Sequence, residues 1–134
     1  MGGWTAEDRY ALRDLGHTLL SEGRYDLARN IFAGLVATDP SDGYSRFALG
    51  VCYRRLNEEG RAVAEMEEAL RADSSLLGAA VHLAEIHFAR GEQEKARRYA
   101  SMAEALGRGR PAAAPALARL RRLSKLAAKR GGAP

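Results

Sequence analysis

The sequence predicts an all-α fold: a right-handed α-solenoid of three helix-turn-helix units, closed by a C-terminal capping helix. The main observation is a pattern that recurs every 34 residues without insertion, as in Gly16, Gly50 and Ala84. Repeats of this length are typical of stacked helical hairpins. The copies read Leu12-x-x-Leu15-Gly16-x-x-Leu19 … Ala28-x-x-x-Phe32-x-x-Leu35, Arg46-x-x-Leu49-Gly50-x-x-Tyr53 … Ala62-x-x-x-Met66-x-x-Ala69 and Ala80-x-x-Leu83-Ala84-x-x-His87 … Ala96-x-x-x-Ala100-x-x-Ala103.

Small residues midway along the first helix of each unit are the second observation. Glycine inside a helix costs about 1 kcal/mol relative to alanine, so Gly16 and Gly50 indicate a packing requirement. We expect the partner helix to approach closely there, with alanines of the second helix facing the gap and leucines filling the seam. The alanines are Ala28, Ala62 and Ala96, and the leucines are Leu15, Leu49 and Leu83.

Start and stop signals place the individual elements. Thr5 is a suitable N-cap, with acidic residues in the first helical turn. Pro40 ends the second helix, because the residue before a proline avoids the α conformation. The same stretch, Asp39 to Asp42, is expected to cap the third helix. We expect helices at about 6–20, 25–38, 43–56, 59–72, 76–90, 92–106 and 112–129. Trp4 is expected to fold onto the first helix and cover the end of the stack; the alternative is an anchor for a partner.

The pattern resembles the tetratricopeptide repeat, except that Leu12, Arg46 and Ala80 stand where that repeat has a leading tryptophan. We therefore expect one domain over residues 1–130. Its repeats would lie at about 9–42, 43–76 and 77–110, with a capping helix at about 112–129 and a disordered tail at 131–134. A terminal helix with a polar outer face is what such arrays need for solubility. We expect its stripe of leucines to cover the third repeat: Leu117, Leu120, Leu123 and Leu126.

Composition narrows the class of protein. The chain has 134 residues, of which 46% are hydrophobic, which is sufficient for a core. No stretch approaches the roughly 20 apolar residues of a membrane span, and residues 1–5 lack the pattern of a signal peptide. A single cysteine, Cys52, excludes an internal disulfide. We therefore expect a cytoplasmic protein.

The charge is divided unevenly along the chain. Residues 1–106 carry 13 Lys and Arg against 17 Asp and Glu, whereas residues 107–134 carry eight Lys and Arg and no acid. The basic C-terminal helix provides an alternative function, that of a scaffold or assembly subunit that binds an acidic partner. Nucleic acid is the less favoured partner, because the segment has no aromatic residues to stack on bases.

The candidate binding site is the concave face formed by the first helix of each unit. Its inward positions are richer in aromatic and aliphatic side chains than a solvated face needs to be, which favours a groove for a peptide segment of a client protein. The alternative is that some of these side chains pack against Trp4 or the seventh helix. The expected peptide-binding residues are Tyr10, Arg13, His17, Tyr44, Phe47, Val51, Arg54, Val81, Glu85 and Phe88.

The sequence supports a catalytic or metal site less well than a peptide-binding site. Cys52 lies on a buried helix face, and a nucleophilic cysteine needs a nearby histidine and access to solvent. His82 and Glu85 share a helix face, but His87 points away and takes a packing position, whereas zinc needs three or four convergent ligands. No phosphate loop or nucleophile elbow occurs. We expect no enzyme activity, metal, cofactor or small-molecule substrate.

The chain also resembles the type III secretion chaperones that hold translocator proteins. The resemblance lies in Phe32-x-Gly34-Leu35-x-x-x-Asp39-Pro40-x-Asp42, followed by Tyr44-x-x-x-x-Leu49-Gly50-x-Cys52. It implies a concave face that keeps an extended apolar client segment soluble, through Tyr10, Tyr44, Phe47, Val51, Val81 and Phe88. Those chaperones have a longer N-terminal helix for self-association, whereas eight residues precede the first repeat here, so a homodimer is left open.

Overall fold

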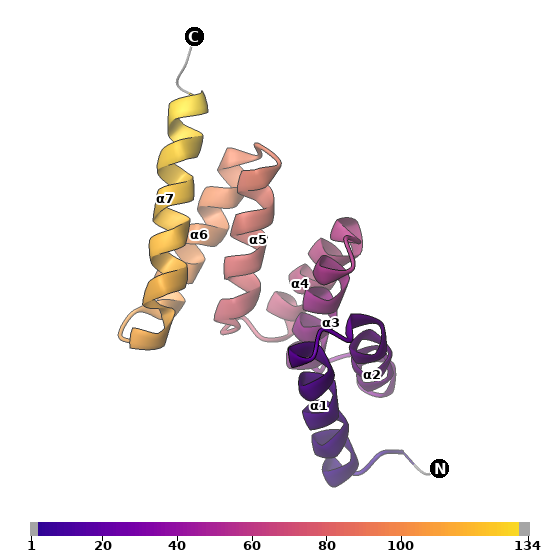
Figure 1. Cartoon of the computed structure of the whole chain (residues 1–134). Coiled ribbons are helices and arrows are strands. Elements are labelled where there is room, and N and C mark those ends of the chain that lie inside the picture. Colours follow the sequence, from indigo (N-terminus) through magenta and orange to yellow (C-terminus); the bar gives the residue numbers. More distant parts are fainter. Residues whose placement is uncertain (1–2, 132–134) are drawn as a thin grey trace. The chain divides into compact units, whose positions relative to one another are not determined.

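The computed structural model describes residues 3–131, and its regular elements there are helices (Figure 1). Contacts divide the chain into two compact units, Met1–Ser74 and Ser75–Pro134, which are treated separately below. The all-α prediction is confirmed, while the single domain and its repeat boundaries stay predictions. The helices are α1 (Ala6–Ser21), α2 (Tyr25–Thr38), α3 (Gly43–Arg55), α4 (Glu59–Ala72), α5 (Leu77–Ala89), α6 (Gln93–Gly107), the short 3-10 helix η1 (Pro111–Ala113) and α7 (Ala114–Gly131).

Two helix starts have the caps that the sequence predicts. The Asp8 backbone N–H donates to Thr5 Oγ1 at 3.1 Å, and the Thr5 N–H donates to the Asp8 carboxylate at 2.9 Å. At α3, Asp42 accepts from the backbone N–H of Ser45 at 3.0 Å. These contacts satisfy N–H groups that have no partner inside the helix, which sets where α1 and α3 begin.

The turn inside each hairpin repeats with the 34-residue period. Gly23, Asn57 and Gly91 all have positive φ angles, of 75°, 62° and 77°. Each turn is also closed by one backbone hydrogen bond of 2.8–2.9 Å, in which the next residue donates to a carbonyl of the preceding helix. Glycine and asparagine adopt this left-handed conformation most readily. The recurrence confirms that the three hairpins share one register.

Glycine allows close helix contact in the first unit, as the sequence predicts. A Cβ atom built on Gly16 would lie 2.7 Å from the Phe32 ring, and one built on Gly50 would lie 2.8 Å from Met66. Phe32 is completely buried, together with Leu35 and Cys52, in a cluster that joins α1, α2 and α3. We call the space left by the missing side chain of Gly16 or Gly50 a notch. The core of this unit therefore lies where the second helix of a hairpin packs into the notch of the first.

The expected role of Leu15 is wrong. Leu49 is 3% exposed and Leu83 is fully buried, but Leu15 is 46% exposed. The two positions have different surroundings: Leu49 lies in the buried cluster with residues of α2, whereas Leu15 is not part of that cluster. Trp4, expected on the first helix, packs against α2, where its ring lies 3.2 Å from a Cβ built on Gly34. Leu15 is left uncovered.

In the second unit, α7 lies along α5 and α6 (Figure 1). Leu117 and Leu120 of α7 are buried in one cluster with Val81 and Phe88 of α5, while Leu123 is partly buried against it. The fourth leucine of the expected stripe, Leu126, is 59% exposed. The C-terminal helix covers the third hairpin as predicted, except at its last turns. Of the expected disordered tail, residue 131 ends α7 and residues 132–134 lie outside the described part.

Candidate functional site

In the first unit, four of the predicted site residues form a connected group on α1 and α3. The Tyr44 hydroxyl and His17 Nε2 are 2.7 Å apart. The Arg13 guanidinium carbon lies 5.4 Å from the centre of the Tyr44 ring, within cation–π distance. The Tyr44 and Phe47 rings meet edge to face, with centroids 6.1 Å apart. We call Arg13, His17, Tyr44 and Phe47 the aromatic face.

Asp42 anchors this face. Its carboxylate accepts from Arg9 at 2.6 Å and forms an ion pair with Arg13 at 3.3 Å, so that α1 is tied to the start of α3. Burial raises the pKa of Asp42, but hydrogen bonds from Ser45 and Arg9 and the charge of Arg13 outweigh that effect, and the pKa is lowered overall. Asp42 is therefore ionised at neutral pH, and it holds Arg13 beside Tyr44.

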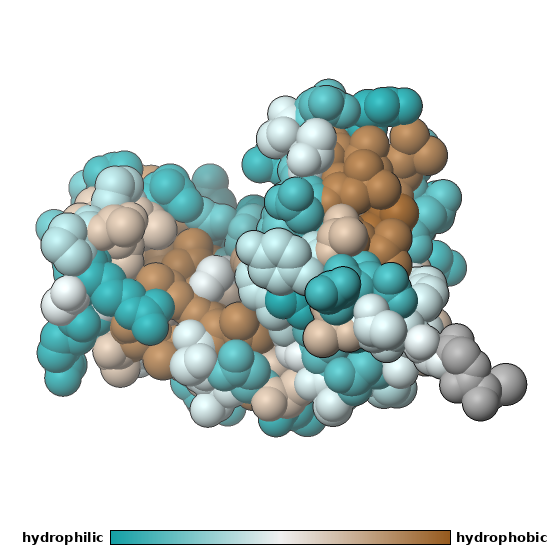
Figure 2. Space-filling model, turned by 90° about the horizontal axis from the view of Figure 1, so that it is seen from below, coloured by the Kyte–Doolittle hydropathy of each residue, from teal (hydrophilic) through white to brown (hydrophobic). Residues whose placement is uncertain are grey.

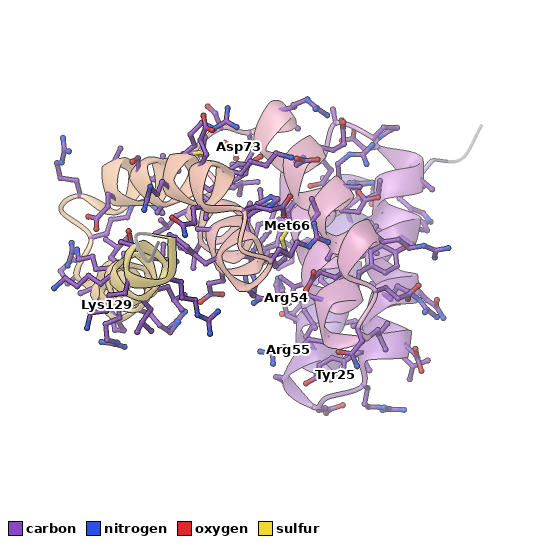
Figure 3. All side chains as sticks on the ribbon, turned by 90° about the horizontal axis from the view of Figure 1, so that it is seen from above. Tyr25, Arg54, Arg55, Met66, Asp73 and Lys129 are labelled. Atoms are coloured by element: carbon purple, nitrogen blue, oxygen red, sulfur yellow. The ribbon has the colours of Figure 1, made fainter. Side chains whose placement is uncertain are left out.

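The other predicted residues of the first unit differ in exposure. Tyr10 on α1 is 73% exposed, the largest exposed fraction among the large hydrophobic side chains for which the structure gives an exposure. Val51 and Arg54 on α3 are partly buried, and Figure 3 labels Arg54 on this helix.

Burial raises the pKa of the Tyr44 hydroxyl, an effect that Arg13 partly offsets. Tyr44 thus stays protonated, as a neutral donor or acceptor at the surface of the face.

In the second unit, a cleft of about 420 Å³ opens between the end of α5, the start of α6 and α7. Two predicted site residues, Glu85 and Phe88, line it. Phe88 is only 8% exposed, because it also belongs to the core cluster with α7. Val81 is 6% exposed in the same cluster and offers little surface to a client. Val81 and Phe88 therefore pack against the seventh helix, which is the alternative that the sequence left open.

Charged and polar contacts shape this cleft. Arg119 Nε of α7 donates to the Glu85 carboxylate at 2.8 Å. Near the start of α6, the Gln93 amide donates to the backbone carbonyl of Ala127 at 2.7 Å. The contacts hold α7 beside α5 and α6 while the cleft stays open.

Cys52 and His87 are in packing positions. Cys52 is fully buried, and burial raises the pKa of its thiol to about 11, so little reactive thiolate is present at neutral pH. The His87 ring stacks on Tyr99 with centroids 5.6 Å apart, and its Nδ1 lies 3.0 Å from the Glu92 carboxylate. Both arrangements agree with the packing roles that the sequence indicates for these residues.

Within residues 3–131, none of the helices combines the length and apolar character that crossing a membrane requires.

Part of the chain matches a known family model. Residues 13–76 match the family model of the tetratricopeptide repeat. The fold is that of the tetratricopeptide repeat. A comparison with curated protein sequences found no match.

Several solved tetratricopeptide-like structures superpose on nearly the whole chain. PcrH in complex with the chaperone-binding region of PopD is 24% identical, with a TM-score of 0.87 and 98% of each chain covered. PcrH from Pseudomonas aeruginosa is 25% identical, with a TM-score of 0.81 over 93% of this chain and 95% of that one. The Yersinia enterocolitica type III secretion translocator chaperone SycD is 18% identical, with a TM-score of 0.89 over 97% and 90%. The resemblance to type III secretion chaperones that was noted in the sequence is thus confirmed as a similarity of fold.

The repeat pattern predicted the residues that form the aromatic face. It did not predict the residues that hold this face in place, or the residues of α7 that line the cleft. Arg9, Leu123 and Leu126 were missed as site residues, although the helical spacing of the two leucines is visible in the sequence. Their role depends on where α7 lies, which a repeat pattern does not specify. Arg9 had a detectable signal, because it lies one helical turn before Arg13 on α1.

Proposed function

We propose that this chain is a non-enzymatic interaction module that binds a peptide segment of a partner protein, as a chaperone in type III secretion. The observation that carries the proposal is the aromatic face of the first unit, with Tyr10 exposed beside it on α1. Aromatic side chains with a polar end are enriched where proteins bind partners, because they supply apolar contact area and a hydrogen bond together.

Similar proteins support the proposal. PcrH was crystallised with the chaperone-binding region of PopD, and SycD is described as a translocator chaperone. On this basis we propose that the client contacts the residues expected from the sequence. The aromatic face, Tyr10, Val51 and Arg54 would act in the first unit, and Glu85 and Phe88 in the second, with Val81 a lesser contributor. The cytoplasmic location expected from the sequence stays a prediction.

Peptide selection tests this function. A phage-displayed random peptide library selected on the wild-type protein is expected to enrich apolar peptides. Replacing Tyr44 and Phe47 together with alanine should weaken their binding by about tenfold or more, because each buried aromatic anchor contributes at least 1–2 kcal/mol. Fluorescence anisotropy with the selected peptides measures the loss.

The matched control for that test is Tyr25→Ala on α2, which removes an aromatic side chain outside the face (Figure 3). It should leave peptide affinity unchanged, and circular dichroism should show that all variants keep their helices. If no peptides are enriched, or if the double variant binds them as tightly as the wild type, the proposed function is wrong.

A homodimer is the second part of the proposal, and exposed and partly buried apolar side chains of Trp4 and the first hairpin support it. We call Trp4, Leu12, Leu15, Leu27 and Ile31 the N-terminal edge. Leu15 and Leu27 are 46% and 43% exposed, and Figure 2 shows brown apolar side chains gathered at the right of that view. Isolated exposed leucines are common, but a contiguous apolar patch marks an interaction site.

The positions of the second hairpin that are equivalent to this edge show how it differs from a covered surface. Leu49, one repeat after Leu15, packs in the cluster with α2. The positions equivalent to Leu12 and Ile31 there are Arg46 and Glu65, which form an ion pair at 2.9 Å. The N-terminal edge is thus more apolar than the internal seam that corresponds to it, and a second copy of the chain would cover it through the same residues.

Sedimentation measures this assembly. We expect the wild-type chain to sediment as a dimer at micromolar concentration, and Leu15→Glu with Leu27→Glu to sediment as a monomer, because the dimer would bury unpaired carboxylates. Leu126→Glu, which changes an exposed leucine of α7, should remain dimeric. A monomeric wild type, or a dimer that tolerates both edge substitutions, would remove the N-terminal edge as the interface.

A further inference from the structure

The cleft of the second unit combines an apolar floor with a basic rim. The floor is made by Phe88 of α5 and by Leu123, Leu126 and Ala127 of α7. Leu126 is the most exposed of them, at 59%, and its side chain is available to an apolar group placed in the cleft. Removing that surface from water favours an aliphatic or aromatic occupant.

Lys129 and Arg130 of α7 line the same cleft and are exposed; Lys129 is labelled at this end of α7 in Figure 3. Among the described residues that line the cleft, Glu85 is the one carboxylate, and Arg119 pairs with it at 2.8 Å. These three basic residues belong to the segment from residue 107 onward, which holds eight basic residues in all and no acid. The rim therefore presents positive charge to any occupant.

We infer that this cleft takes an apolar side chain of the client whose neighbouring residues are acidic. The inference rests on the proposed function, and it adds the chemistry of the client segment. The apolar side chain would lie against Phe88 and Leu126, and the flanking carboxylates would pair with Lys129 and Arg130. A client with basic flanks would place like charges together at the rim, which disfavours binding.

Two matched synthetic peptides test the inference. Both carry the same leucines, and their flanking residues are glutamate in one and lysine in the other. The acidic peptide should bind the wild-type protein about tenfold more tightly than the basic one, since two partly exposed charge pairs are gained and two repulsions avoided. Fluorescence anisotropy at low and at physiological salt measures both affinities, and the difference should shrink as salt rises.

Charge reversal locates the effect. Lys129→Glu with Arg130→Glu should abolish or reverse the preference for the acidic peptide. Arg122→Glu with Lys125→Glu changes the net charge of α7 equally, but neither residue lines the cleft, so the preference should be largely kept. Leu126→Ser should lower the affinity for the acidic peptide by several-fold, because the apolar surface of the cleft is reduced.

Three results would overturn the inference: equal affinity for both peptides, no binding of either, or equal effects of the two charge-reversed variants. Competition by a single-stranded oligonucleotide as effective as the acidic peptide would also overturn it, because charge alone would then explain binding. The proposed function is tested separately by the library selection on the aromatic face. Enriched peptides that bind there without a preference for acidic flanks would leave the function standing and reject the client chemistry.

Discussion

Replacing Phe32 with alanine is expected to lower the free energy of unfolding of the first unit by about 3 to 5 kcal/mol. Phe32 is fully buried, and its ring fills the notch opposite Gly16. Alanine would leave a cavity where α1, α2 and α3 meet, and close-packed neighbours collapse only partly into such a space. Trp4, the one tryptophan, packs on α2 in this unit, so denaturant unfolding followed by its fluorescence reports the change.

Two further variants make the Phe32 result specific. Asn30→Ala, at an exposed position of the same helix outside the N-terminal edge, should change stability by no more than about 0.5 kcal/mol. Gly16→Ala should destabilise the protein alone, since the new Cβ would clash with the Phe32 ring, and should cost less when combined with Phe32→Ala. Additive effects of Gly16→Ala and Phe32→Ala would show that the notch and the ring do not depend on each other.

Replacing Leu120 with alanine is the second large effect, an expected loss of about 2 to 5 kcal/mol from the second unit. Leu120 is 1% exposed and belongs to the cluster that α7 forms with Val81 and Phe88 of α5. Its truncation weakens the attachment of the whole C-terminal helix. Denaturant unfolding followed by circular dichroism measures the loss of helix.

The control for Leu120 lies on the same helix. Leu126→Ala removes an equal volume from an exposed position and should change stability by at most about 0.5 kcal/mol. If Leu120→Ala were equally mild, α7 would be a loosely attached binding element, and its role as a cap of the third hairpin would have to be abandoned.

The sequence predicted the features that depend on local pattern. The register of the hairpins, the Thr5 and Asp42 caps and the notches at Gly16 and Gly50 follow from spacing and from the conformational preferences of single residues. The turns at Gly23, Asn57 and Gly91 recur with the same period, and all three residues have positive φ angles. Asparagine can stand at the second position because, after glycine, it is among the residues that best tolerate positive φ.

Features that depend on what lies next to a repeat could not be predicted in the same way. Leu15 and Leu49 occupy the same position in the pattern, yet one is exposed and the other is buried against residues of α2. Phe88 was placed on an open face, but α7 covers most of it. A periodic pattern describes the interior of an array, and its two ends are determined by non-periodic residues.

The recurring turn has a consequence for how such a chain lengthens in evolution. Each hairpin closes its own turn with main-chain bonds and one residue in the left-handed conformation. A duplicated gene segment of one period would bring a complete turn with it, and the new hairpin would need no adjustment of loop length. Selection would then act chiefly on the terminal hairpins, whose outer sides meet solvent or another protein in place of a neighbouring repeat.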